Sequence, residues 1–121
     1  MTKTVLITGG AYGIGRAIAR AFAPDHNVAV TWHKSAPDAL LAEAPEVFPV
    51  QSDLTAEGAA EQVVSAVTGR FGGLDVIVNN AGGAAATPLE DFDPARSRSI
   101  LDVNLLAPAA LLAAALPHLE A

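Results

Sequence analysis

The stretch Thr8-Gly9-Gly10-Ala11-Tyr12-Gly13-Ile14-Gly15 decides the fold, because its glycines separate an apolar run from a helical pattern. Residues 4–8 before it are short and β-branched, which is typical of a buried strand. Residues 13–23 after it carry apolar side chains at helical spacing and stop at Pro24. A strand, a glycine-rich turn and a helix in this order predict a βα unit that can receive a phosphate group.

The alternation of strand and helix continues along the chain. Apolar runs at residues 27–32, 47–50 and 74–78 predict three further strands. Residues 36–44 form a weak, Ala-rich helical pattern. Thr55 predicts the start of a capped helix that ends near Gly69.

A last helix is expected to begin at Asp93-Pro94, which combines an N-capping acid with proline at the first helical position, and to run through residues 94–119. Strands without polar alternation, joined by helices, predict a parallel sheet that is covered on both faces. Right-handed crossovers make a doubly wound α/β sheet, a Rossmann fold of about four strands and four helices, the expected architecture. We expect residues 1–121 to form a single domain.

Composition narrows the classes of function. Hydrophobic residues make up 51% and charged residues 17% of the chain, which excludes a disordered composition. The net charge of −6 argues against a nucleic-acid or anionic-membrane partner. The absence of cysteine excludes disulfides, thiolate catalysis and cysteine-ligated metals, and no metal site is predicted. No signal peptide or span-length apolar run is evident, although residues 105–116 come closest, so a cytoplasmic location is expected.

The glycine turn has a specific chemical use. Glycine permits positive φ and lets a pyrophosphate approach the backbone, and the helix start beyond it offers free N–H groups. Glycine-rich turns also occur for structural reasons alone. The turn residues that we expect to contact a dinucleotide are Gly9, Ala11, Tyr12, Gly13, Ile14 and Gly15.

The spacing G-x-x-x-G-x-G after Thr8, together with Asn79-Asn80-Ala81-Gly82 after the fourth strand, resembles the short-chain dehydrogenase/reductase family. Asp53-Leu54 is similar to the adenine-contacting pair of that family, and Asp102-Val103-Asn104-Leu105 to its helix motif. The resemblance covers the whole chain. It implies a Rossmann fold, NAD or NADP as cofactor, and hydride transfer that reduces a carbonyl or oxidises an alcohol. It also implies cofactor contacts from Asp53, Leu54, Asn79, Asn80, Ala81, Gly82 and Val103.

Several of these residues also have a purely structural interpretation. Asp53 can cap a turn, and Asn79 and Asn80 can satisfy backbone groups at a strand end. Asn104 can be a polar residue on a helix surface. For these positions the functional interpretation depends on their joint occurrence.

The segment that closes the second strand favours NADP over NAD. A carboxylate there would bind the ribose 2′-hydroxyl, whereas a cation accommodates a 2′-phosphate. No acid occurs until Asp38, while Lys34 and the Ser35 hydroxyl would attract a phosphate and His33 could add charge at low pH. Tyr12 occupies the place where many NADP-using relatives carry a second basic residue.

Most of the family's catalytic residues do not occur in the chain. The resemblance implies a Ser and a Tyr-x-x-x-Lys pair, but the single tyrosine, Tyr12, is followed four residues later by Arg16. Only Asn104 of the catalytic set has a counterpart. We therefore expect the N-terminal, cofactor-binding part of an enzyme, with little turnover alone. The alternatives are a non-catalytic dinucleotide-binding module and a piece of the fold that binds no ligand.

Two further expectations concern the C-terminal half. Pro108 has no N–H, so the carbonyl of Asn104 lacks its usual i+4 donor and the helix should kink. The apolar strand 74–78 and the helix 94–119 would expose apolar surface, which predicts a homo-oligomer formed through either element or both.

Overall fold

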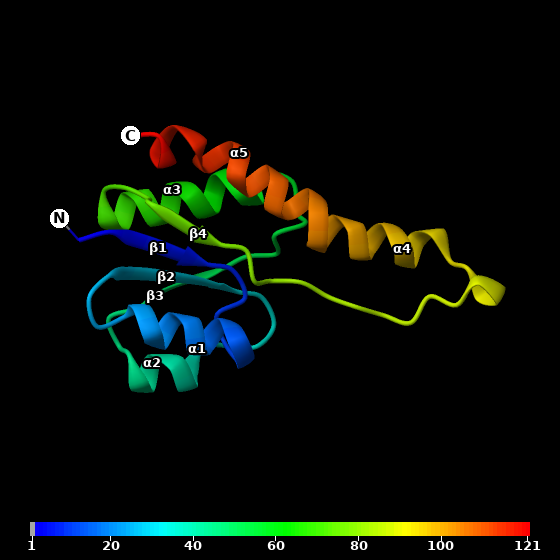
Figure 1. Cartoon of the computed structure of the whole chain (residues 1–121), viewed down its shortest axis with the longest axis horizontal. Coiled ribbons are helices and arrows are strands. Elements are labelled where there is room, and N and C mark those ends of the chain that lie inside the picture. The colour runs from blue at the N-terminus through cyan, green and yellow to red at the C-terminus, as the bar shows by residue number, and fades with distance from the viewer. Residues whose placement is uncertain (1) are drawn as a thin grey trace.

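The computed structural model describes residues 2–121 as a four-stranded parallel sheet with helices on both faces (Figure 1). The strands follow the order β3-β2-β1-β4, so that the first strand lies in the interior of the sheet. The predicted doubly wound parallel sheet is confirmed. The strands are β1 (Thr4–Ile7), β2 (Asn27–Trp32), β3 (Phe48–Gln51) and β4 (Val76–Val78).

The helices divide between the two faces of the sheet. Helices α1 (Gly13–Phe22) and α2 (Asp38–Glu43) cover one face, and α3 (Ala59–Phe71) and α5 (Ala107–Leu119) cover the other (Figure 1). Helix α4 (Pro94–Leu101) extends beyond the sheet, after a long loop that contains a short 3-10 turn, Leu89–Asp91 (Figure 1).

The strand pattern produces two separate cores because side chains alternate between the faces of the sheet. Leu6 packs with α3 and α5 residues such as Val63 and Leu111, while Val5 and Ile7 pack with residues that include Ala19 and Leu40 on the opposite face. The central strand β1 is buried along its whole length. This rigid centre positions the loops that leave the carboxyl ends of the strands.

The predicted start of a helix at Thr55 is wrong. The Asp53 carboxylate accepts hydrogen bonds from the Thr55 N–H at 3.0 Å and from its hydroxyl at 2.6 Å, which forms a turn. Gly58 then adopts φ of +76°, and α3 begins only at Ala59. The helix continues past Gly69 to Phe71 and ends at Gly72, whose φ is +85°.

The predicted start of the last helix is confirmed. The Asp93 carboxylate accepts a hydrogen bond from the Ala95 N–H at 3.0 Å, and Pro94 occupies the first helical turn. Helical structure then continues without a break through Pro94–Leu119 (Figure 1). By length and composition this 26-residue segment could cross a membrane, with a mean hydropathy of 1.8 over an 18-residue window. The expectation that no segment reaches span length is therefore corrected, because α4, a π-helical turn and α5 join into one helix.

Strand β4 lies at an edge of the sheet and is shorter than the predicted strand 74–78. At its start the Thr4 N–H donates to the Asp75 carboxylate at 2.8 Å, where a strand carbonyl would otherwise accept. Leu74 is buried in the core although it precedes the strand. The apolar character of 74–78 therefore reflects both core packing and sheet pairing.

Candidate functional site

The glycine turn follows β1 and leads directly into α1. Gly9 and Gly13 have φ values of +68° and +59°, a conformation that residues with side chains rarely adopt. A Cβ at Gly15 would lie 2.1 Å from the Gly9 carbonyl oxygen, and one at Gly10 would lie 2.5 Å from the Val30 side chain. The turn is therefore packed against both α1 and β2, and Gly10, which was not singled out from the sequence, is required there for close packing.

Thr31 at the end of β2 holds this turn in place. Its hydroxyl oxygen accepts a hydrogen bond from the Gly9 N–H at 3.1 Å, and its carbonyl accepts one from the Gly10 N–H at 3.0 Å. Thr31 is buried, and the bond from the Gly9 N–H is partly buried. Sequence reasoning missed this residue because a threonine inside a strand carries no distinctive pattern.

The loop after β4 is joined to the same turn. The Thr8 hydroxyl oxygen accepts hydrogen bonds from the N–H groups of Asn80, at 3.0 Å, and Ala81, at 2.9 Å. The Asn80 side-chain amide donates to the carbonyls of Thr8, at 3.1 Å, and Gly9, at 3.0 Å. The predicted structural role of Asn80 is confirmed. Asn79 is exposed and forms no side-chain hydrogen bond among residues 2–121.

These loops enclose a cleft of about 500 Å³ at the carboxyl ends of the strands. In doubly wound sheets this is the edge at which ligands bind. Three segments contribute most of the wall: the glycine turn, the loop after β2 and the loop after β4. The lining residues are Gly9, Ala11, Tyr12, Gly13, Ile14, Thr31, Trp32, His33, Lys34, Ser35, Ser52, Leu54, Asn80, Ala81, Gly82 and Val103.

Most of the residues selected from the sequence come together in this cleft; Gly15, Asp53, Asn79 and Asn104 do not line it. Gly15 supports the turn from behind through its close approach to Gly9. Trp32 and Ser52 line the cleft but were not selected from the sequence. The Ser52 N–H donates to the Trp32 carbonyl at 2.8 Å, which links the ends of β2 and β3. Trp32 could have been selected from the sequence, because the last residue of a parallel strand lies at the edge of the sheet where ligands bind.

Asp53 serves as a turn cap in this structure, as its structural interpretation predicts. Hydrogen bonds from the Thr55 hydroxyl and N–H hold the pKa of the Asp53 carboxyl below its ordinary value of 3.8. The charges of His33 and Lys34 lower this pKa further, although by less. The loops after β2 and β3 therefore lie close enough to interact electrostatically.

The charge of the cleft differs from that of the whole chain. Lys34 and His33 line it, whereas no aspartate or glutamate does within the described part of the chain. The chain carries a net charge of −6, so this absence of carboxylates concentrates positive potential locally. The cleft is suited to an anionic ligand.

Asn104 anchors the loop after β4 to the last helix. Its side-chain oxygen accepts a hydrogen bond from the Gly83 N–H at 2.9 Å, and its amide donates to the Gly83 carbonyl at 2.7 Å. A Cβ at Gly82 would lie 2.8 Å from the same Asn104 oxygen. Asn104 is thus a specific loop contact and not only a polar residue on a helix surface.

The helix changes its hydrogen-bonding pattern at Asn104. Residues Asp102–Leu106 form a π-helical turn, and the Ala107 N–H donates to the Asp102 carbonyl five residues earlier. The α-helical pattern is therefore interrupted next to Pro108, where the sequence predicted a disturbance. The helix continues on both sides of the turn (Figure 1). Such π turns occur frequently at functional sites.

The short chain dehydrogenase family profile matches residues 3–121. This chain belongs to the short-chain dehydrogenase family. Among curated relatives, the chain is 39% identical to L-fucose dehydrogenase of Mus musculus, over 98% of this chain and 44% of that protein. It is 34% identical to D-beta-hydroxybutyrate dehydrogenase of Rhizobium meliloti, over 99% of this chain and 50% of that one. The chain thus spans about half the length of these relatives.

Solved structures of the family have the same arrangement of elements. A short chain dehydrogenase of Burkholderia cenocepacia in complex with NADP superimposes with a TM-score of 0.90 and 38% identity, covering 97% of this chain and 51% of that one. An NADH-dependent reductase complexed with NAD superimposes with a TM-score of 0.89 and 34% identity, covering 98% of this chain and 53% of that one. The short-chain dehydrogenase chain described here therefore has the Rossmann-like architecture of its family.

Proposed function

We propose that this chain binds NADP in preference to NAD and is the cofactor-binding part of an oxidoreductase. The single observation that carries the proposal is the cleft at the carboxyl ends of the strands, which is lined by the glycine turn and by Lys34 and, within the described residues, by no carboxylate. The chemistry proposed for the whole enzyme is reduction of a small carbonyl compound or oxidation of an alcohol.

The glycine turn would hold the pyrophosphate. Ala11, Gly13 and Ile14 line the cleft at the start of α1, where the first N–H groups have no partner within the helix. These N–H groups and the positive end of the helix dipole favour a phosphate. The Thr31 hydroxyl oxygen accepts from the Gly9 N–H and the Asn80 amide donates to the Gly9 carbonyl, which holds this backbone in shape before a ligand arrives.

The loop after β2 would select the phosphorylated ribose. Trp32 closes the strand at the place where a carboxylate would bind a free 2′-hydroxyl, so the contact that favours NAD is missing. Lys34 and Ser35 offer a cation and a hydroxyl to a 2′-phosphate. A family member that is 38% identical was solved with NADP and one that is 34% identical with NAD, so the family accommodates both.

Bound NADP would supply the hydride donor or acceptor. The residues of this chain would bind and orient it: Asn80 maintains the turn beneath it, and Asn104 holds the loop at Gly82 and Gly83 beside the cleft. The chain contains no Tyr-x-x-x-Lys pair to supply the proton that accompanies hydride transfer. A non-catalytic dinucleotide-binding module is therefore the second candidate.

The preference for NADP can be tested by titration of NADPH and NADH into the chain. Trp32, the only tryptophan, lines the cleft, so its emission should fall as a dinucleotide binds. We expect NADPH to bind about tenfold more tightly than NADH, because a charge-assisted hydrogen bond contributes about 1.5–3 kcal/mol. Lys34→Gln should reduce this ratio towards one, while Lys3→Gln, at the only other lysine, should leave it unchanged. Equal affinities in the unmodified chain would contradict the proposal.

Turnover separates the two candidates. NADPH oxidation with simple ketones should be followed in parallel with the titration. Binding without turnover would support the non-catalytic module. Turnover by this chain would show that residues other than a Tyr-x-x-x-Lys pair provide the proton.

A further inference from the structure

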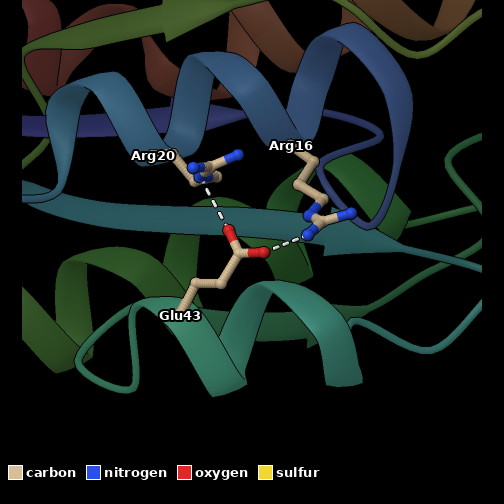
Figure 2. Close-up of polar contacts among 3 residues, drawn as sticks. All are labelled: Arg16, Arg20 and Glu43. Atoms are coloured by element: carbon tan, nitrogen blue, oxygen red, sulfur yellow. Dashed lines mark hydrogen bonds and ion pairs between the residues drawn. The ribbon is translucent and has the colours of Figure 1, made fainter.

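One carboxylate connects the two helices that cover the same face of the sheet. Glu43, the last residue of α2, forms ion pairs with Arg16 and Arg20 of α1 (Figure 2). Arg20 Nε lies 2.7 Å from Glu43 Oε2, and Arg16 Nη2 contacts the other oxygen, Oε1. Arg16 Nε is buried and has no hydrogen-bond partner among residues 2–121, while the rest of the side chain is partly exposed and pairs with Glu43.

Helix α2 depends on such tertiary contacts. It is only six residues long, and the residue before it, Pro37, provides no side-chain cap. A short helix of this kind has little stability of its own. Its apolar side chains pack in the core beneath α1, where Leu40 is fully buried and Leu41 lies against the same cluster, and Glu43 adds the ion pairs to α1.

The loop between β2 and α2 is held at its start by a hydrogen bond from Gln51 and at its end by the contacts of α2 with α1. His33, Lys34 and Ser35 line the cleft and are exposed. At the start of the loop, Gln51 Nε2 donates to the His33 carbonyl at 3.3 Å. At its far end the loop leads into α2, which Glu43 joins to Arg16 and Arg20 in the middle and last turn of α1.

We propose that Glu43 is a positioning residue that keeps the loop 33–37 at the correct distance from the glycine turn, and thereby sets the preference for NADP over NAD. This inference rests on the proposed function. Arg16 lies one turn after Gly13 on α1, so its ion pair links the half of the cleft that would receive the pyrophosphate to the half that would receive the 2′-phosphate. NAD lacks that phosphate and should be much less sensitive to the loop.

The direction in which NADP affinity changes when Glu43 loses its charge distinguishes a positioning role from a purely electrostatic one. Removing a negative charge should by itself attract the more anionic NADP more strongly. Loss of positioning should instead weaken NADP binding. Glu46, three residues later, is exposed and forms no ion pair in the described chain, so Glu46→Gln makes the same charge change without touching the arginines.

The experiment compares Glu43→Gln with Glu46→Gln in the 121-residue chain, with Trp32 emission reporting NADPH and NADH binding. Glu43→Gln should weaken NADPH binding by about threefold or more and change NADH binding by less than about twofold. Backbone hydrogen exchange of residues 33–36, measured without ligand, should be faster in Glu43→Gln only. Unchanged or tighter NADPH binding in Glu43→Gln, or exchange equal to that of Glu46→Gln, would overturn the inference.

The same binding data show whether only the positioning role of Glu43 is wrong or the proposed NADP binding as well. An unmodified chain that prefers NADPH, combined with an unchanged ratio in Glu43→Gln, would overturn the positioning role alone. An unmodified chain that binds neither dinucleotide would overturn the proposed function and with it the selectivity role of Glu43.

Discussion

Thr8 and Asn80 are joined by reciprocal hydrogen bonds: the Thr8 hydroxyl oxygen accepts from the Asn80 N–H at 3.0 Å, and the Asn80 amide donates to the Thr8 carbonyl at 3.1 Å. The two residues lie 72 positions apart and end neighbouring strands, β1 and β4. Their contact connects the glycine turn to the loop after β4, which also lines the cleft.

Replacing Thr8 by valine should therefore destabilise the chain. Valine has nearly the same shape but cannot accept the N–H groups of Asn80 and Ala81, which are partly buried. We expect the free energy of unfolding to fall by about 1–3 kcal/mol. Urea denaturation should show this loss, whereas Thr87→Val, in an exposed loop, should have almost no effect. Equal effects of the two substitutions would contradict a stabilising role for the hydrogen bonds that the Thr8 hydroxyl accepts from Asn80 and Ala81.

Gly15 and Gly69 should respond in opposite directions to alanine. The Gly15 Cβ would clash with the Gly9 carbonyl, so Gly15→Ala should cost about 1–3 kcal/mol and weaken dinucleotide binding. Gly69 lies in α3 with open space around it, and Gly69→Ala should stabilise the chain by about 0.5–1 kcal/mol. Thermal unfolding of the two variants measures both effects. Two losses of similar size would contradict the assignment of the clash to Gly15.

Asn104→Ala should loosen the loop at Gly83 without unfolding the domain. Both hydrogen bonds to Gly83 would be lost, but the contact is exposed, so the global cost should stay below about 1 kcal/mol. Hydrogen exchange at the Gly83 amide should accelerate about three- to tenfold. Asn79→Ala is the control, because that side chain has no hydrogen bond in the described residues. Unaltered exchange at Gly83 would refute the role of Asn104 as an anchor.

Asp53 should make stability sensitive to acid. Because the folded-state pKa lies below 3.8, the stabilisation is present above the unfolded-state pKa and is lost as the pH falls through the folded-state pKa. Thr55→Val removes the largest cause of the shift and should raise the Asp53 pKa towards its ordinary value, while Thr55→Ser should retain the shift. An NMR titration of the Asp53 carboxyl measures the pKa directly. The same pKa in all three chains would exclude the Thr55 hydroxyl as its cause.

Self-association remains a prediction of the exposed apolar surface. Leu105 and Leu112 on the last helix are 60% and 44% exposed, and β4 leaves an unpaired strand edge. We expect oligomers in light scattering at micromolar concentration. The double variant Leu105→Gln/Leu112→Gln should shift the distribution towards monomer, whereas Ile14→Gln, at a still more exposed residue of the glycine turn, should not. A monomeric unmodified chain would disprove the prediction.

Local patterns were sufficient to predict the order of the elements and the glycine turn. The apolar runs and the glycines at 9, 13 and 15 predicted the parallel sheet and the βα turn. Strand-forming patterns and tight turns can be predicted in this way because they depend mainly on residues that are close together along the chain. Asp93-Pro94 predicted a helix start for the same reason. Thr55 did not, because the competing Asp53 carboxylate and the positive φ of Gly58 moved the start to Ala59.

The sequence by itself determined that this chain forms a Rossmann-like sheet with a glycine turn after its first strand. Only the tertiary structure showed that Thr31 and Asn80 hold that turn, that Trp32 lines the cleft and that Glu43 joins α2 to α1. The physical reason is distance along the chain. Turn glycines act through their own φ angles, whereas these contacts join residues that become neighbours only when the parallel strands align their carboxyl ends and the helices pack against the sheet.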